Sequence, residues 1–227
     1  AASDAGARVT LVEREERPGG ILKQCVHDGF GLIRFGEKLS GPEYAYRYLR
    51  LAAERELPIL TQTFLLALER DAEGYRLRLQ NSRQGVFELR AAAVVWAAGC
   101  RERTARQVFI HGDRPAGIFT AGMVQYMVNV QGYLPTRRCV ILGSGDIGLI
   151  MARRLTLEGA SVKGVFEIQP YPSGLPRNIT QCLDDYDIPL FLSHTVTAIH
   201  GTKRLTGVTV SQVDSSFRPI PDTEKEW

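Results

Sequence analysis

The residues best suited to chemistry are three glycines and one acidic residue. Gly143, Gly145 and Gly148 form a G-x-G-x-x-G pattern, and Glu167 follows about 20 residues later. In this pattern the first glycine allows a tight turn, the second lets the backbone approach a phosphate, and the third lets a helix pack closely on a strand. A carboxylate at this distance accepts hydrogen bonds from the hydroxyls of a ribose. The four residues therefore predict a dinucleotide site.

The segments around these residues are those that must position them. Residues 140–142 form an apolar run that predicts a buried strand, and residues 150–157 have helical spacing. Gly159 can end this helix, and a second apolar strand over 162–166 leads to Glu167. The dipole and the free N–H groups at the start of the helix favour a phosphate there.

We expect this segment to bind NAD, because a carboxylate at Glu167 repels the 2′-phosphate of NADP. A glycine-rich turn in another kind of α/β domain is the alternative, but it does not explain the position of the acid. The residues predicted to bind NAD are Gly143, Ser144, Gly145, Asp146, Ile147, Gly148 and Glu167.

The start of the chain repeats the second half of this unit. Residues 5–9 resemble residues 158–162, and an apolar strand then ends at Glu13. A simple strand that happens to end in an acidic residue is the alternative. The repeat predicts a strand and a glycine turn before Ala1, so we expect the chain to lack its natural N-terminus.

Two further segments carry a resemblance to a known family. Pro18-Gly19-Gly20 follows Glu13, and residues 94–99 form an apolar run that ends in Ala98-Gly99. Together with the G-x-G-x-x-G unit, they resemble the pyridine nucleotide–disulfide oxidoreductase superfamily, the flavoproteins with two dinucleotide-binding domains. The resemblance covers nearly all of the chain, although Ala98 replaces the usual threonine. It implies an FAD site with contributions from Glu13, Arg14, Gly19, Gly20, Ala98 and Gly99.

Residues 19–31 and 39–44 are similar to a bacterial subgroup of FAD- and NAD-dependent oxidoreductases. This subgroup is related to subunits of opine, sarcosine and hydrogen-cyanide-forming amine oxidases. The resemblance implies hydride transfer between a nicotinamide cofactor and flavin, within an amine, opine or polyol dehydrogenase system. It also implies a small-molecule substrate, a partner subunit, and a homo- or hetero-oligomer.

The family's C-terminal Gly-Asp segment has no counterpart near residue 227, so we expect truncation at both ends. A nucleotide-binding fragment without activity is one alternative. A thioredoxin-reductase-like thiol-disulfide reductase is another, although the cysteines at 25, 100, 139 and 182 form no C-x-x-C pair. The cysteines and histidines also lack the spacing of metal ligands, so no metal site is expected.

The resemblance places the segment after Pro-Gly-Gly near the flavin ring, which makes Cys25 and His27 the candidate catalytic residues. A histidine there could move a proton or favour the anionic reduced flavin. The alternatives are a histidine that only hydrogen-bonds within its loop and a buried structural thiol.

Composition excludes several classes of protein. An apolar content of 44% in 227 residues fits a globular protein. A net charge of +3 is too small to indicate nucleic acid or an acidic membrane surface. The sequence contains no stretch of about 18 apolar residues, which a membrane-spanning helix would need. We expect a cytoplasmic protein.

These patterns predict an α/β fold with two Rossmann-like units. We expect a partial FAD-binding domain over 1–105, a connecting loop and helix over 106–136, and an NAD(P)-binding domain without its closing strand over 137–227. A helix is expected over 43–57, and a three-stranded antiparallel meander is expected within the first domain, with strands over 59–68, 75–80 and 86–89.

Overall fold

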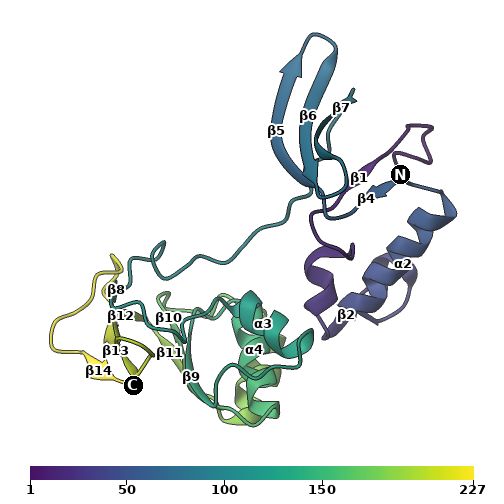
Figure 1. Cartoon of the computed structure of the whole chain (residues 1–227). Coiled ribbons are helices and arrows are strands. Elements are labelled where there is room, and N and C mark those ends of the chain that lie inside the picture. Colours follow the sequence, from purple (N-terminus) through teal and green to yellow (C-terminus); the bar gives the residue numbers. More distant parts are fainter. The chain divides into compact units, whose positions relative to one another are not determined.

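The chain forms two compact units, Ala1–Cys100 (unit 1) and Arg101–Trp227 (unit 2), in a computed structural model that describes residues 1–227 (Figure 1). We describe each unit by itself. The assignment of the units to FAD and NAD stays a prediction. Among the helices of the chain, none combines the length and the apolar composition that a membrane crossing requires.

The longest helix of unit 1 is α2 (Gly41–Glu54). Its first turn is fixed by a capping box, in which Ser40 and Glu43 each accept a hydrogen bond from the backbone of the other. Pro42 lies in the first turn, where a missing N–H has no cost. The remaining elements before α2 are short: β1 (Leu11–Val12), η1 (Gly20–Gln24), β2 (Asp28–Phe30), α1 (Leu32–Phe35) and β3 (Leu39–Ser40).

The expected three-stranded meander is confirmed. The strands β5 (Phe64–Asp71), β6 (Gly74–Asn81) and β7 (Gly85–Ala91) pair antiparallel in sequence order. Residues 59–60 are not part of the first strand, however. They form β4 (Ile59–Leu60), which pairs in parallel with β1.

The apolar run over 94–99, which the family resemblance would make a strand, does not form one. This segment has no regular secondary structure, and the side chains of Val95 and Trp96 are 89% and 68% exposed. A strand needs a neighbour to pair its N–H and C=O groups. The only parallel pair of unit 1 is β1 with β4, two residues long on each side, and the backbone of 94–99 pairs with neither strand.

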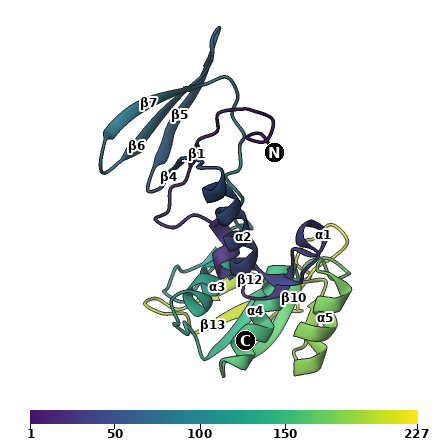
Figure 2. The ribbon, with the colours of Figure 1, turned by 90° about the vertical axis from the view of Figure 1, so that its right-hand side faces the viewer.

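Unit 2 contains the predicted parallel sheet and its crossover helix. The sheet consists of β9 (Arg138–Leu142), β10 (Ser161–Glu167) and β11 (Leu190–Leu192), in the order β11-β10-β9. The helix α4 (Asp146–Leu157) joins β9 to β10, and Gly159 follows its end with a left-handed φ of 87°. The other helices are α3 (Ala121–Asn129), α5 (Pro176–Cys182) and η2 (Asp184–Tyr186), and Figure 2 shows α5 beside α4.

One expectation for this sheet is wrong. Residues 140–142 were expected to be a buried strand, but β9 is an edge strand and Leu142 is 38% exposed. The reason is that only β10 pairs with β9. The faces of β9 are nevertheless covered, because Ile141 packs on the α4 core and Val140 packs against a second sheet.

The second sheet has the order β14-β13-β12-β8. Its apolar residues on β12 and β13 form a core with the fully buried Phe166 of β10. Ser193 has a φ of 54° and separates β11 of the first sheet from β12 of the second. The members are β8 (His111–Gly112), β12 (His194–His200), β13 (Gly207–Gln212) and β14 (Lys225–Glu226).

Candidate nucleotide site

The glycine pattern forms a tight turn between β9 and α4. Gly143 has a φ of 96°, in the region that favours glycine, and its N–H donates to the carbonyl of Phe166 over 2.7 Å. A Cβ on Gly148 would lie 2.8 Å from the carbonyl oxygen of Gly143. The first glycine therefore serves the backbone turn, and the third serves the close packing of helix on turn.

The second glycine has no such structural requirement. Gly145 is the N-cap of α4 with extended backbone angles, and a Cβ built on it meets no atom within 4 Å. The first N–H groups of any helix lack partners within the helix, and in α4 no side chain caps them either. A bare helix start with open space above the glycine fits the pyrophosphate of a dinucleotide.

Glu167 ends β10 beside this turn and is 4% exposed. Its Oε2 accepts hydrogen bonds from the amide of Ser144 at 2.9 Å and from the hydroxyls of Ser144 and Ser173, both at 2.6 Å. Its Oε1 accepts from the amide of Gln169 at 3.0 Å. Burial alone would raise the pKa of Glu167, but the four hydrogen bonds outweigh it and hold the pKa below its usual value. The carboxylate is therefore charged at neutral pH.

The loop after β10 packs directly on the glycine turn. Asp146 Oδ1 accepts from the amide of Leu175 at 2.8 Å and from the side-chain amide of Asn178 at 2.7 Å. Ser173 donates its own amide to the hydroxyl of Ser144 at 2.9 Å. A Cβ on Gly174 would lie 2.6 Å from a methyl group of Leu149, so the loop and α4 are in close contact.

The structure thus brings together the seven residues predicted to bind NAD. Two of their side chains have structural contacts of their own. Asp146 holds the loop with its carboxylate, and Ile147 packs its side chain on the apolar core. Sequence reasoning missed Ser173, Gln169 and Asn178. The cluster of Pro, Ser and Gly after Glu167 indicated a loop, but nothing in it indicated that the loop would return to the turn.

The residues predicted to bind FAD lie in two separate segments of unit 1. Glu13 follows β1 and accepts from the amide of Glu15 at 2.9 Å, while Gly19 and Gly20 lead into η1 with φ of 123° and 55°. Arg14, Ala98 and Gly99 are exposed, the last two in the segment without a strand. Their role toward FAD stays a prediction.

The two predicted catalytic residues have different environments. Cys25 is buried, its thiol lies 3.3 Å from the carbonyl oxygen of Ile21, and burial raises its pKa. His27 is half-buried, with its ring centroid 5.2 Å from that of Phe30 and Nδ1 3.1 Å from the carbonyl oxygen of Asp28. These contacts suit a thiol that stays protonated at neutral pH and a histidine that remains open to a ligand.

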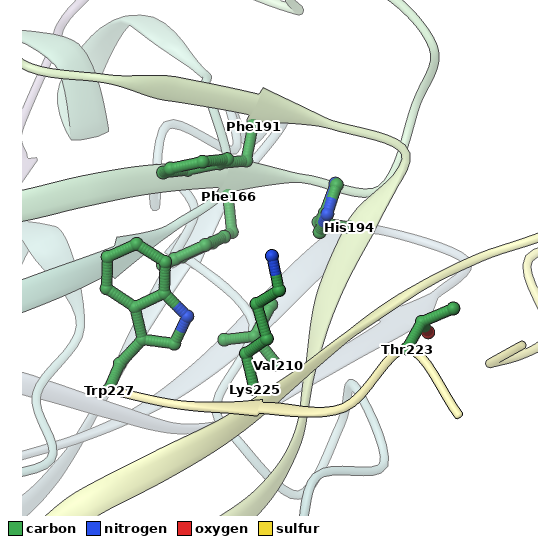
Figure 3. A pocket seen from close by; sticks show the side chains of 7 residues that line it. All are labelled: Phe166, Phe191, His194, Val210, Thr223, Lys225 and Trp227. Carbon is green, nitrogen blue, oxygen red and sulfur yellow. The ribbon is translucent and has the colours of Figure 1, made fainter. Parts of the chain in front are cut away.

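An aromatic pocket lies next to Glu167, on the other side of β10. Figure 3 shows the rings of Phe166, Phe191 and Trp227 around it, with the Lys225 side chain reaching toward Phe191 and His194. Ring centroids lie 5.0 to 5.2 Å apart among the three aromatic residues. The cavity measures about 40 Å³, which is space for a few water molecules. It cannot hold a nucleotide, and we interpret it as part of the core.

No protein-family model matches the chain. Two curated relatives are subunits HcnB of hydrogen cyanide synthase. The one from Pseudomonas aeruginosa is 25% identical and covers 94% of this chain and 48% of its own length. The one from Pseudomonas protegens is 27% identical and covers 73% and 34%. The chain therefore spans about half, or less, of the length of these relatives.

Solved structures match the chain over its whole length. A thioredoxin reductase from Lactococcus lactis matches with a TM-score of 0.70 at 13% identity, covering 100% of this chain and 68% of its own. The thioredoxin reductase of T. acidophilum matches with a TM-score of 0.67 at 17% identity, covering 100% and 67%. The chain therefore shares the fold of these two thioredoxin reductases over the part that they have in common. The mixed α/β class expected from the sequence is confirmed.

Proposed function

We propose that this chain is the nucleotide-binding part of an FAD- and NAD-dependent flavoprotein oxidoreductase. The observation that carries the proposal is the open glycine turn at the start of α4, with a charged carboxylate, Glu167, beside it. The fold and the resemblance to HcnB support the same class of protein.

The residues of unit 2 would have three tasks. The first N–H groups of α4 and the open space at Gly145 would hold the pyrophosphate. Glu167 would accept hydrogen bonds from the adenine ribose, and its charge would repel a 2′-phosphate, which favours NAD over NADP. A bound nicotinamide cofactor would donate a hydride to the flavin or accept one from it, and the chain would supply binding and orientation.

Unit 1 would contribute to the flavin side. Glu13, Arg14, Gly19, Gly20, Ala98 and Gly99 would contact FAD, and Cys25 and His27 would lie closest to its reactive ring. Of these two, His27 is the better candidate for proton transfer, since its ring is only half-buried whereas Cys25 is buried. Cys25 is buried and would pack beneath the site.

The relatives suggest the setting of this activity. HcnB is a subunit of a synthase, so we propose that this chain also works with a partner subunit. The reaction would be oxidation of a small molecule in an amine, opine or polyol dehydrogenase system, and the protein would be cytoplasmic.

Thiol-disulfide reduction is the weaker alternative, although the fold occurs in thioredoxin reductases. No disulfide joins the four cysteines. Burial raises the pKa of Cys25 and Cys182, and it raises the pKa of Cys139 to about 11. A thiol-exchange enzyme needs a thiolate at neutral pH, which these three residues do not provide.

The visible and near-ultraviolet spectra of the purified chain, titrated with NADH and with FAD, test the proposal. We expect saturable binding of NADH. We expect FAD to bind weakly, because unit 1 contains no G-x-G-x-x-G turn between a strand and a helix to hold its pyrophosphate. A chain that binds neither nucleotide would contradict the proposal, and stoichiometric flavin in the purified protein would contradict the weak FAD binding.

A further inference from the structure

Oε2 of Glu167 has no acceptor capacity left for a ribose, because it already accepts three hydrogen bonds. An ionised carboxylate offers about four acceptor positions. The amide and hydroxyl of Ser144, the hydroxyl of Ser173 and the amide of Gln169 together supply four hydrogen bonds. Oε1 accepts from Gln169 alone and can take one ribose hydroxyl, whereas a second ribose hydroxyl can bind at Oε2 only if one of its three donors leaves.

Three of the four donors are fixed. The amide of Ser144 belongs to the glycine turn, its hydroxyl is on a fully buried side chain, and the amide of Gln169 lies two residues from Glu167 along the chain. Removing any of them would leave a buried polar group without a partner or would break the turn. None can be exchanged at low cost.

Ser173 is the donor that can leave. It is exposed, so water can hydrogen-bond its hydroxyl after the bond to Glu167 breaks. Its loop does not have to unfold, because Asp146 holds the loop on its far side through Leu175 and Asn178. Rotation of the Ser173 side chain would therefore free one position on Oε2 of Glu167.

We propose that the Ser173 hydroxyl competes with the adenine ribose for Glu167, and that Ser173 thereby sets the affinity for NADH. This rests on the proposed function of the turn as a nucleotide site. A bound ribose hydroxyl takes the position that Ser173 gives up, so the chain exchanges one hydrogen bond for another. The competition lowers affinity only for nucleotides that donate to Glu167. NADPH carries a phosphate at the 2′ position and gains little from the loss of Ser173.

The test is a titration of the 227-residue chain with NADH and with NADPH, followed by nucleotide fluorescence. Ser173→Ala and Ser173→Gly both remove the hydroxyl, and each should bind NADH on the order of tenfold more tightly. Ser173→Thr keeps a hydroxyl and should stay within about twofold of the wild type. Ser161→Ala removes an exposed hydroxyl at the start of β10 and should change nothing. Affinity for NADPH should rise by no more than about twofold in any variant.

The outcomes separate the two proposals. Equal NADH affinity in Ser173→Ala and wild type would overturn the competition, and weaker binding would show instead that Ser173 positions Glu167 for the nucleotide. Both results would leave the nucleotide site itself intact. Absence of NADH binding in the wild type and in all variants would overturn the proposed site and the role of Ser173 with it.

Discussion

The hydroxyl of Ser144 donates to the carboxylate of Glu167 over 2.6 Å, and the amide of Ser144 donates to the same oxygen over 2.9 Å. The two residues are 23 positions apart in the chain. Ser144 lies in the turn after β9, and Glu167 ends β10. The pair therefore ties the glycine turn to the neighbouring strand end, which keeps the start of α4 beside the carboxylate.

Replacing Glu167 by glutamine should lower the free energy of unfolding of unit 2 by about 2 kcal/mol at pH 7, because hydrogen bonds to a charged acceptor are lost. The folded-state pKa of Glu167 is below its unfolded value, so its stabilisation is present above about pH 4.5 and is lost as the pH falls through the folded pKa. The difference between wild type and Glu167→Gln should thus shrink in acid.

The difference in unfolding free energy can be measured by urea unfolding, followed by the fluorescence of Trp227. A Trp96→Phe background leaves Trp227 as the single tryptophan. Trp227 packs against Phe166, next to Glu167. Glu158→Gln is the matched control, since its ion pair with Arg154 is exposed, and it should cost no more than about 0.5 kcal/mol. If the loss of unfolding free energy in Glu167→Gln is the same at every pH, the predicted charge of Glu167 in the folded state is wrong.

Gly148→Ala should destabilise unit 2 by about 1–3 kcal/mol, because its Cβ would lie 2.8 Å from a backbone carbonyl oxygen. Gly145→Ala should stay within about 1 kcal/mol of the wild type, since its backbone is extended and its Cβ meets open space. Thermal unfolding of both variants provides the comparison. Equal loss in the two would show that Gly145 is also required for packing.

Ser40→Ala should destabilise the first turn of α2 by about 1 kcal/mol, because the capping box with Glu43 is lost. Glu43→Gln should retain most of the box, since glutamine also accepts from the N-cap amide. Hydrogen exchange of the α2 amides, measured by mass spectrometry, reports the local free energy of opening. Unchanged exchange in Ser40→Ala would show that packing alone fixes this helix end.

Alkylation with iodoacetamide at pH 8 should modify Cys100 first. Cys100 is exposed, whereas Cys25 and Cys182 are buried and the pKa of Cys139 is raised to about 11. We expect these three to react more slowly by roughly tenfold or more, because the thiolate is the reactive form. Peptide mapping gives the rate at each site. Rapid modification of Cys25 would instead support a function in thiol-disulfide reduction.

The elements that depend on local sequence could be predicted. The turn at Gly143 to Gly148, the helix that follows and the strand that ends at Glu167 all form as expected. Ser40, Pro42 and Glu43 mark the start of α2 in the sequence itself. Such signals act over a few residues, so a single sequence contains them.

Features that depend on distant pairing could not be predicted. Residues 94–99 have the composition of a strand but no partner, and β9 has a neighbour on one side only. Ser173 reaches a residue 29 positions away, and its type and spacing carry no mark of that contact. The carboxylate was expected to be free for a ribose, because the sequence shows the acid but not its hydrogen-bond donors.

The most direct test of the central claim is NADH titration of the wild-type chain and of Gly145→Ala, with binding followed by fluorescence. The account predicts saturable binding by the wild type, with NADH preferred to NADPH. It also predicts loss of binding in Gly145→Ala, whose added methyl would occupy the space for the pyrophosphate while folding stays intact. NADH binding that is absent from the wild type, or equal in Gly145→Ala, would contradict the claim that this turn is a dinucleotide site.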